Sequence, residues 1–170
     1  IFAGGQTPRS LIFQVSLAGG ESADFSVLAG TRKSYKAETF GRFVPERLDD
    51  YAWENNVVAY RIYGPALESM LVTNGIDYWA KSTPELVIDA WYEKDLGGKG
   101  SYHLDTGEGN DCYNVGATLG MGASAPVAGD KLCYSRNFAS WKTLDNGPVR
   151  TSFELTYAPF AVGDMQVSLV

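Results

Sequence analysis

Along most of this chain, apolar residues alternate with polar ones, and a period of two favours extended strands over helices. In residues 10–17, every second residue from Leu11 to Leu17 is apolar. Further strands are expected at residues 25–27, 38–44, 57–63, 132–141, 149–157 and 165–170. The 19 glycines suit tight turns between strands, and the 13% of aromatic residues suit pleated sheets. The sequence therefore predicts a mainly β protein, most simply an antiparallel β-sandwich.

One segment departs from this pattern and predicts a helix. Pro84 follows Ser82 and Thr83, and proline is favoured at the first position of a helix. The residues after it (ELVIDAWYEKD) repeat apolar side chains at helical spacing until Gly97 and Gly98. We therefore expect one short helix between the strands.

The length and charge of the chain exclude several classes of protein. Its 170 residues suffice for a single β-rich domain, residues 1–170, but show fewer strands than two full sandwich faces need, so we expect part of a longer sandwich. The net charge of −6 argues against a nucleic-acid partner. No stretch reaches the roughly 20 apolar residues of a membrane helix, so no membrane partner is expected. The two cysteines, Cys112 and Cys133, can form one disulfide or stay as separate thiols.

The only histidine of the sequence lies in the segment that most resembles a functional loop. Acidic and aromatic residues gather there between glycines: Tyr102, His103, Asp105, Glu108, Asp111 and Tyr113. Three functional interpretations fit: acid–base catalysis by His103 with a carboxylate, a Ca²⁺ site of three carboxylates, or sugar binding by stacked tyrosines. The carboxylates would equally suit a turn in which they cap backbone N–H groups. A metal site built on two or three histidines is excluded.

A second group of candidate residues lies around the strand expected at residues 57–63. Trp53 and Glu54 precede this strand, and Arg61 lies on a face that it shares with apolar residues. An arginine in such a place needs a carboxylate partner, either from the protein itself, which we favour, or from an acidic sugar. Arg42, Arg47 and Arg136 present the same two alternatives.

Four sequence segments occur in a fixed order that resembles the domain-of-unknown-function family 4861. They are RFVPERLDDYAWENNVVAYRIYGPAL, NGIDYWAKSTPELVIDAWY, YHLDTGEGNDCYNVGATLGMG and NGPVRTSFELTY. The resemblance implies an exported protein of Bacteroidota, about twice this length, with a galactose-mutarotase-like sandwich and action on fragments of plant or algal polysaccharide. The family pattern YHxDHGEG has a second histidine where this chain has Thr106.

The resemblance and the residues together predict a carbohydrate-active protein, of lyase or dehydratase type if it is catalytic. Its expected catalytic residues are His103, Glu108, Arg61 and Tyr113. The residues expected to bind substrate are Arg42, Trp53, Glu54, Tyr102, Asp105, Asp111 and Arg136. The alternatives are a non-catalytic carbohydrate-binding or accessory domain, and a mutarotase or epimerase that pairs His103 with Glu108.

The same reasoning predicts the partners and the compartment. We expect an oligosaccharide ligand and no cofactor, with a calcium ion as the minor alternative. The expected protein partners are the C-terminal half that the resemblance implies, or a second copy of the chain. The expected location is the periplasm or the extracellular space.

Overall fold

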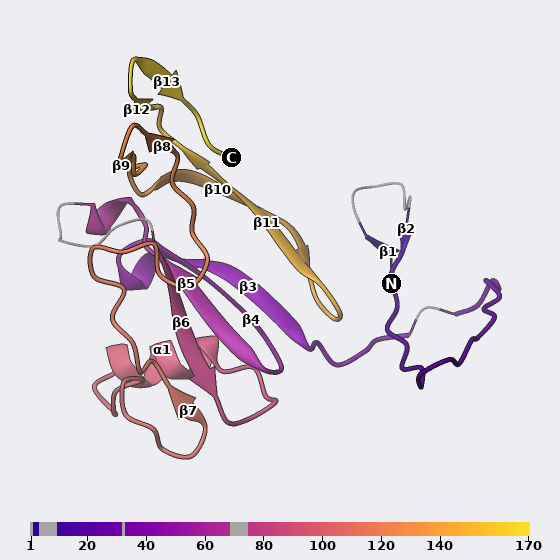
Figure 1. Ribbon diagram of the computed structural model, residues 1–170. Coiled ribbons are helices and arrows are strands. Elements are labelled where there is room, and N and C mark those ends of the chain that lie inside the picture. Colours follow the sequence, from indigo (N-terminus) through magenta and orange to yellow (C-terminus); the bar gives the residue numbers. More distant parts are fainter. Residues whose placement is uncertain (1, 4–9, 32, 69–74) are drawn as a thin grey trace.

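The computed structural model describes residues 2–3, 10–31, 33–68 and 75–170, and its centre is an antiparallel sheet of five strands (Figure 1). In spatial order, these strands are β3 (Thr39–Val44), β4 (Asp50–Asn55), β5 (Val58–Ile62), β6 (Ile76–Lys81) and β7 (Gly109–Asn110). Each strand pairs with its neighbour in the sequence, so the sheet is a simple meander. The strands expected at residues 38–44 and 57–63 are confirmed as β3 and β5.

The remaining elements surround this sheet. The helix α1 (Ile88–Leu96) and the long hairpin of β10 (Phe138–Asn146) and β11 (Thr151–Tyr157) are the largest of them. Short pairs are formed by β1 (Phe2–Ala3) with β2 (Ser10–Leu11), β8 (Val127–Ala128) with β9 (Lys131–Leu132), and β12 (Phe160–Val162) with β13 (Met165–Val167). Two 3-10 turns, η1 (Pro45–Arg47) and η2 (Pro65–Leu67), follow β3 and β5. No helix in the described ranges is long and apolar enough to cross a membrane.

Alternation along the strands gives the central sheet two buried faces. On one face, Ala52, Ala59 and Trp79 pack against α1, where Trp91 stacks on Trp79 at a ring-centroid distance of 5.5 Å. On the other face, Tyr51 and Ile62 pack against side chains of the β10–β11 hairpin. The sheet is thus enclosed between a helix and a second, smaller β layer, and the expected sandwich-like, mainly β architecture is confirmed. The galactose-mutarotase-like form stays a prediction.

The predicted helix is present but starts later than expected, at Ile88 rather than Pro84. Its first backbone N–H groups are capped from outside the helix by Glu54, whose carboxylate accepts from Val87 and Ile88 at 2.9 Å. The same carboxylate is 2.7 Å from Lys81 Nζ, with both side chains fully buried. Glu54 therefore joins the end of β4 to the start of the helix, in the interior.

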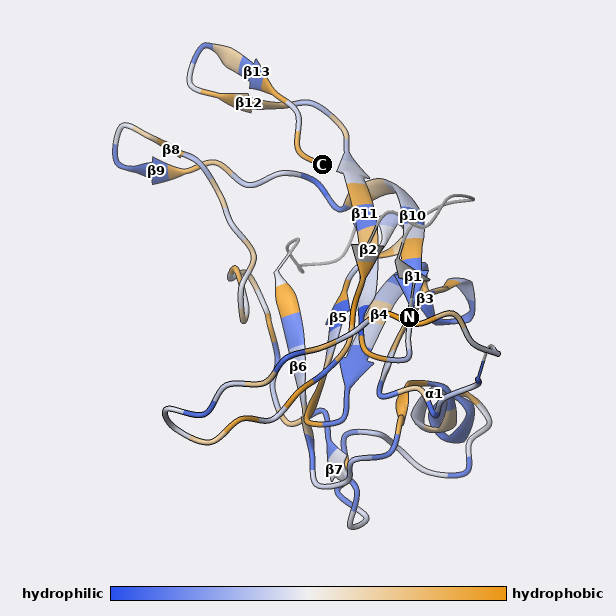
Figure 2. Ribbon diagram, turned by 90° about the vertical axis from the view of Figure 1, so that its right-hand side faces the viewer, coloured by the Kyte–Doolittle hydropathy of each residue, from blue (hydrophilic) through white to orange (hydrophobic). Residues whose placement is uncertain are grey.

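The strands expected at residues 10–17 and 25–27 are wrong beyond Leu11, because the extended chain there has no ladder partner among the described residues. Phe13, Val15 and Phe25 are 50%, 48% and 57% exposed. Figure 2 shows hydrophobic stretches along this segment between β2 and β3.

The strand expected at 132–141 is also wrong in its middle, since residues 133–137 form a coil between β9 and β10. Asn137 is buried in this coil, and its side-chain amide donates to the carbonyl oxygen of Gly64 at 2.8 Å. The strands expected at 149–157 and 165–170 are confirmed in the shorter forms β11 and β13.

Replacing Glu54 by glutamine is expected to lower the free energy of unfolding by about 3 kcal/mol, because it leaves the buried Lys81 ammonium without its carboxylate. Urea unfolding followed by circular dichroism measures this change. Glu93→Gln, on the exposed surface of α1, is the matched control and is expected to change stability by less than about 0.5 kcal/mol. Equal effects of the two substitutions would contradict the interior role of Glu54.

Candidate functional site

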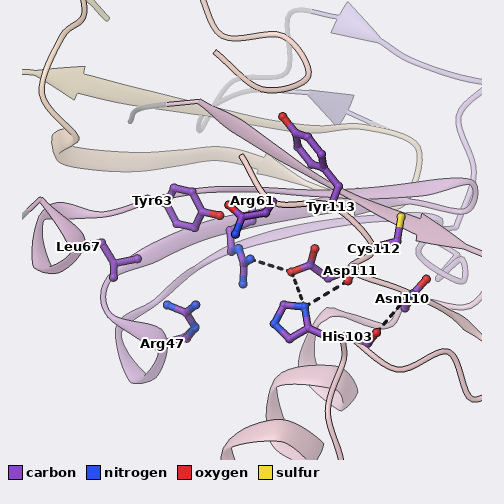
Figure 3. Close-up of a pocket in the computed structure, with 10 residues that line it drawn as sticks. Arg47, Arg61, Tyr63, Leu67, His103, Asn110, Asp111, Cys112 and Tyr113 are labelled. Carbon is purple, nitrogen blue, oxygen red and sulfur yellow. Dashed lines mark hydrogen bonds and ion pairs between the residues drawn. The ribbon is translucent and has the colours of Figure 1, made fainter. Parts of the chain in front are cut away.

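A pocket of about 570 Å³ opens at the end of the central sheet near η1 and η2 (Figure 3). It is lined by Arg47, Arg61, Tyr63, Leu67, His103, Asn110, Asp111, Cys112, Tyr113 and Asn114. These residues come from the turn after β3, the end of β5 and the turn that follows it, and the segment around β7. The pocket therefore joins the two parts of the sequence in which candidate site residues were expected.

Arg61 is buried at the base of this pocket and holds several acidic groups together. It lies directly opposite Asp77 in the β5–β6 register, and its Nε donates to Asp77 Oδ2 at 3.0 Å. Its Nη2 contacts the same oxygen and donates to Asp111 Oδ2 at 2.9 Å. The internal ion pair that the sequence favoured for Arg61 is confirmed.

The guanidinium of Arg61 is also surrounded by aromatic rings. The ring centroids of Tyr63, Trp79 and Tyr102 lie 5.3, 5.2 and 5.4 Å from its central carbon. Burial by itself lowers the pKa of Arg61, but Tyr92 and the nearby aspartates outweigh it and hold the pKa well above its ordinary value. Arg61 is therefore a fixed cation that organises the base of the pocket.

His103 lies at the mouth of the pocket and is held by Asp111. Its side chain is 57% exposed, whereas that of Asp111 is only 1% exposed. His103 Nδ1 is 3.2 Å from the backbone carbonyl oxygen of Asp111 and 3.4 Å from Oδ2 of its carboxylate. A carbonyl oxygen only accepts hydrogen bonds, so this contact favours the tautomer of the neutral imidazole that has its proton on Nδ1 and a lone pair on Nε2. In Figure 3, this second nitrogen faces away from Asp111, on the side of Arg47.

Tyr102 connects the two arginines beneath His103. Its hydroxyl accepts hydrogen bonds from Arg61 Nη1 at 3.0 Å and from Arg47 Nε at 3.2 Å. Its ring lies 4.6 Å from the ring of His103 and stacks on Trp79 at 5.2 Å. The residue before the histidine thus contributes a buried hydrogen-bond acceptor that fixes both guanidinium groups.

Two buried carboxyl groups near Arg61 have raised pKa values. Asp50 is fully buried, with its Oδ2 3.9 Å from Arg61 Nε and 3.8 Å from Arg47 Nη1. Burial raises the pKa of Asp50 to about 7, against the opposing attraction of Arg61 and Arg47. Burial also raises the pKa of Asp111, against Arg61 and His103. The pocket therefore borders a carboxyl group that gains or loses a proton near neutral pH.

The structure places the two other acidic residues of the histidine loop outside the pocket lining. Asp105 Oδ1 accepts from the backbone N–H groups of Gly107 and Gly109 at 2.8 and 3.1 Å, which confirms the turn-capping alternative for this residue. Glu108 Oε2 accepts from the indole N–H of Trp91 at 3.2 Å. In the described part of the chain, no three acidic, histidine or cysteine side chains form a group that could hold a metal ion.

The remaining candidates also have partners elsewhere. Arg42 pairs with Asp89 and Glu46, both at 2.6 Å, and Arg136 pairs with Glu68. Trp53 is on the opposite face of the sheet and stacks on Tyr60 at 5.5 Å. Cys112 and Cys133 are free thiols. Of the residues expected from the sequence, the structure brings together Arg61, Tyr102, His103, Asp111 and Tyr113.

Two charged residues at this site, Asp77 and Asp50, were not expected from the sequence, and Arg47 was expected only as one of several arginines with two alternative partners. Asp77 could have been predicted from the sequence. Alternation places it on the same strand face as Trp79, and an acidic residue on a buried face needs a cation opposite it. Asp50 left no such signal, and nothing in the sequence distinguished Arg47 from Arg42 and Arg136. Arg47 and Asp50 lie in and just after a turn whose geometry no periodicity determines.

The chain belongs to the family described as a domain of unknown function, DUF4861, whose model matches residues 3–170. It is 38% identical over 173 residues to a protein of Formosa agariphila described as "Uncharacterized protein P7". The match covers 95% of this chain and 44% of that relative, so the chain spans less than half the length of the relative. No solved structure matches this chain significantly.

Replacing Asp50 by asparagine is expected to weaken the pH dependence of stability. Because the pKa of Asp50 is about 7 in the folded state, above the roughly 3.9 of an unfolded aspartate, only the folded state keeps this proton between those pH values. Its contribution to the free energy of unfolding therefore falls as the pH rises from about 4 to about 7, then levels off. Asp50→Asn, which carries no charge, is expected to be more stable than the wild type above pH 7 by roughly 2–4 kcal/mol.

Urea unfolding across that pH range measures this difference. Asp164→Asn, in the exposed turn between β12 and β13, is the control and is expected to keep the wild-type pH dependence. A parallel pH dependence in the wild type and Asp50→Asn would show that Asp50 is not the group that titrates.

The neutral imidazole of His103 is expected to carry its proton on Nδ1, because Nδ1 faces the carbonyl oxygen of Asp111. Long-range ¹H–¹⁵N NMR distinguishes the two ring nitrogens, and the single histidine of the chain makes the assignment unambiguous. A protonated Nε2 and an unprotonated Nδ1 would contradict the hydrogen bond to Asp111.

Proposed function

We propose that this DUF4861 protein is a carbohydrate-active protein that binds oligosaccharide fragments of plant or algal polysaccharide in the His103 pocket. The further proposal is that His103 acts as a general base there, in an elimination of lyase or dehydratase type. Export to the periplasm or the cell exterior, where such fragments are encountered, belongs to the same proposal.

The observation that carries this proposal is the His103–Asp111–Arg61 chain of contacts. An exposed imidazole is oriented by a buried residue, which is in turn paired with a buried cation 2.9 Å away. This arrangement leaves Nε2 free to take a proton from a molecule in the pocket.

The proposed elimination uses His103 and a tyrosine that lines the same pocket. His103 Nε2 removes a proton from a ring carbon, and the electron pair of that C–H bond forms a C=C bond while the neighbouring C–O bond breaks. The departing oxygen needs a proton, which a tyrosine hydroxyl can donate. Burial raises the pKa of Tyr63 to about 12, so its hydroxyl is protonated at neutral pH, but it donates to Asp77 Oδ2 at 3.4 Å. The half-buried Tyr113 lines the same pocket and is the tyrosine proposed as the proton donor.

A non-catalytic carbohydrate-binding domain is the second candidate. One observation favours it: Thr106 stands where the family pattern has a second histidine. For a mutarotase, the expected partner of His103 was Glu108, whose carboxylate bonds to Trp91 and does not line the pocket. The site geometry therefore gives that alternative no support.

Substituting His103 by asparagine is expected to abolish product formation from uronate- or rhamnose-containing oligosaccharides, measured as ultraviolet absorbance of the new C=C bond. Loss of a general base typically lowers the rate by about 10²–10⁴-fold. Asp164→Asn is expected to retain the wild-type rate.

In the wild type, the same oligosaccharides should shift the single imidazole signal of His103 in ¹H–¹³C NMR spectra. A shift without absorbance would favour the binding domain over the enzyme. If no oligosaccharide at millimolar concentration shifts the signal, the pocket does not bind these sugars and the proposal fails.

A further inference from the structure

The guanidinium of Arg47 has donor capacity that the described residues leave unused. Its Nε donates to Tyr102, but its buried Nη1 makes no hydrogen bond with any described residue. The nearest carboxylate oxygen, Oδ2 of Asp50, is 3.8 Å from Nη1, which is beyond hydrogen-bond distance. In Arg61, by contrast, all three nitrogens donate to oxygen atoms.

The backbone holds Arg47 in this position on the pocket wall. Arg47 ends the turn η1, and the next two residues, Leu48 and Asp49, have left-handed backbones with φ of 52° and 62°. Such conformations are strained for residues other than glycine. This turn packs closely on Gly64, where an added Cβ would overlap the carbonyl oxygen of Asp49. The strained turn and its close contact fix the chain that carries Arg47.

Arg47 has a single ion-pair partner among the described residues, at a distance too long for a hydrogen bond. Asp77 and Asp111 both bond to Arg61, and neither forms an ion pair with Arg47. Asp50 is the only carboxylate that forms an ion pair with Arg47 among the described residues. Burial raises the pKa of Asp50 to about 7, so in mildly acidic solution this group is mostly neutral and does not cancel the charge of Arg47.

We infer that Arg47 forms an anion subsite of the His103 pocket and binds the carboxylate or sulfate group of an acidic sugar. A guanidinium whose Nη1 has no hydrogen-bond partner among the described residues is suited to the oxygens of either group. The inference rests on the proposed function and narrows its substrates to acidic oligosaccharides. In an elimination next to a carboxylate, a cation at this point stabilises the negative charge that develops as the proton leaves.

The test compares three probes in mildly acidic, low-salt buffer: oligogalacturonate, a sulfated carrageenan oligosaccharide and a neutral galactan oligosaccharide. Binding is followed by calorimetry and by the His103 imidazole signal. At least one acidic probe is expected to bind more tightly than the neutral one, and Arg47→Met is expected to weaken that binding by about tenfold or more. The responding probe identifies the group as carboxylate or sulfate.

Two further variants separate a specific role of Arg47 from a loss of structure. Arg150→Met removes a surface arginine that pairs with Asp145, and it is expected to bind all probes like the wild type. Arg47→Lys keeps the charge without the planar fork, and it is expected to retain part of the affinity for the acidic probe. Unfolding midpoints show whether each variant is folded under the binding conditions.

The outcomes distinguish this inference from the proposed function. Equal binding of acidic and neutral probes, or an acidic probe that binds Arg47→Met as tightly as the wild type, would overturn the anion subsite alone. Failure of every probe to bind the wild type or to shift the His103 signal would overturn both the subsite and the proposed function.

Discussion

The buried ion pair between Arg61 and Asp77 is the interaction on which the rest of the site depends. Both groups lie directly opposite each other on adjacent central strands, where their removal from water costs free energy that only complete pairing offsets. Arg61 also binds Asp111 and Tyr102, which belong to the segment that carries His103. The strand register, the course of that segment and the orientation of the imidazole therefore depend on one guanidinium group.

Much of the fold could be predicted because it follows from local pattern. The face of β5 on which each side chain lies could be predicted, because alternation along a strand does not depend on distant residues. The start of the helix could not be placed, since its cap is the carboxylate of Glu54, which is distant in sequence. Residues 12–17 alternate equally well but form no strand, because a strand needs a partner and pairing is not encoded in alternation.

The candidate site was predictable where its residues are close together in sequence. Tyr102, His103 and Asp111 were expected in one place, and the structure brings them to one pocket with Arg61. Spacing could not show that Asp111, and not Glu108, would orient the imidazole, because this depends on how a glycine-rich loop reverses direction. Arg47 could not be told apart from Arg42 and Arg136, and Asp50 was not expected, because their places at the pocket arise only when β3, β4 and β5 are assembled.

The left-handed pair Leu48 and Asp49 has a consequence for engineering this protein. Glycine at either position would relieve backbone strain in the folded state, and it would also make the turn more pliable in its contact with Gly64. Selection for a more heat-stable protein would therefore enrich glycine at these positions. In such variants, the turn is no longer strained and no longer holds Arg47 against the pocket. In this turn, substitutions that increase the stability of the fold are therefore expected to weaken ligand binding by Arg47.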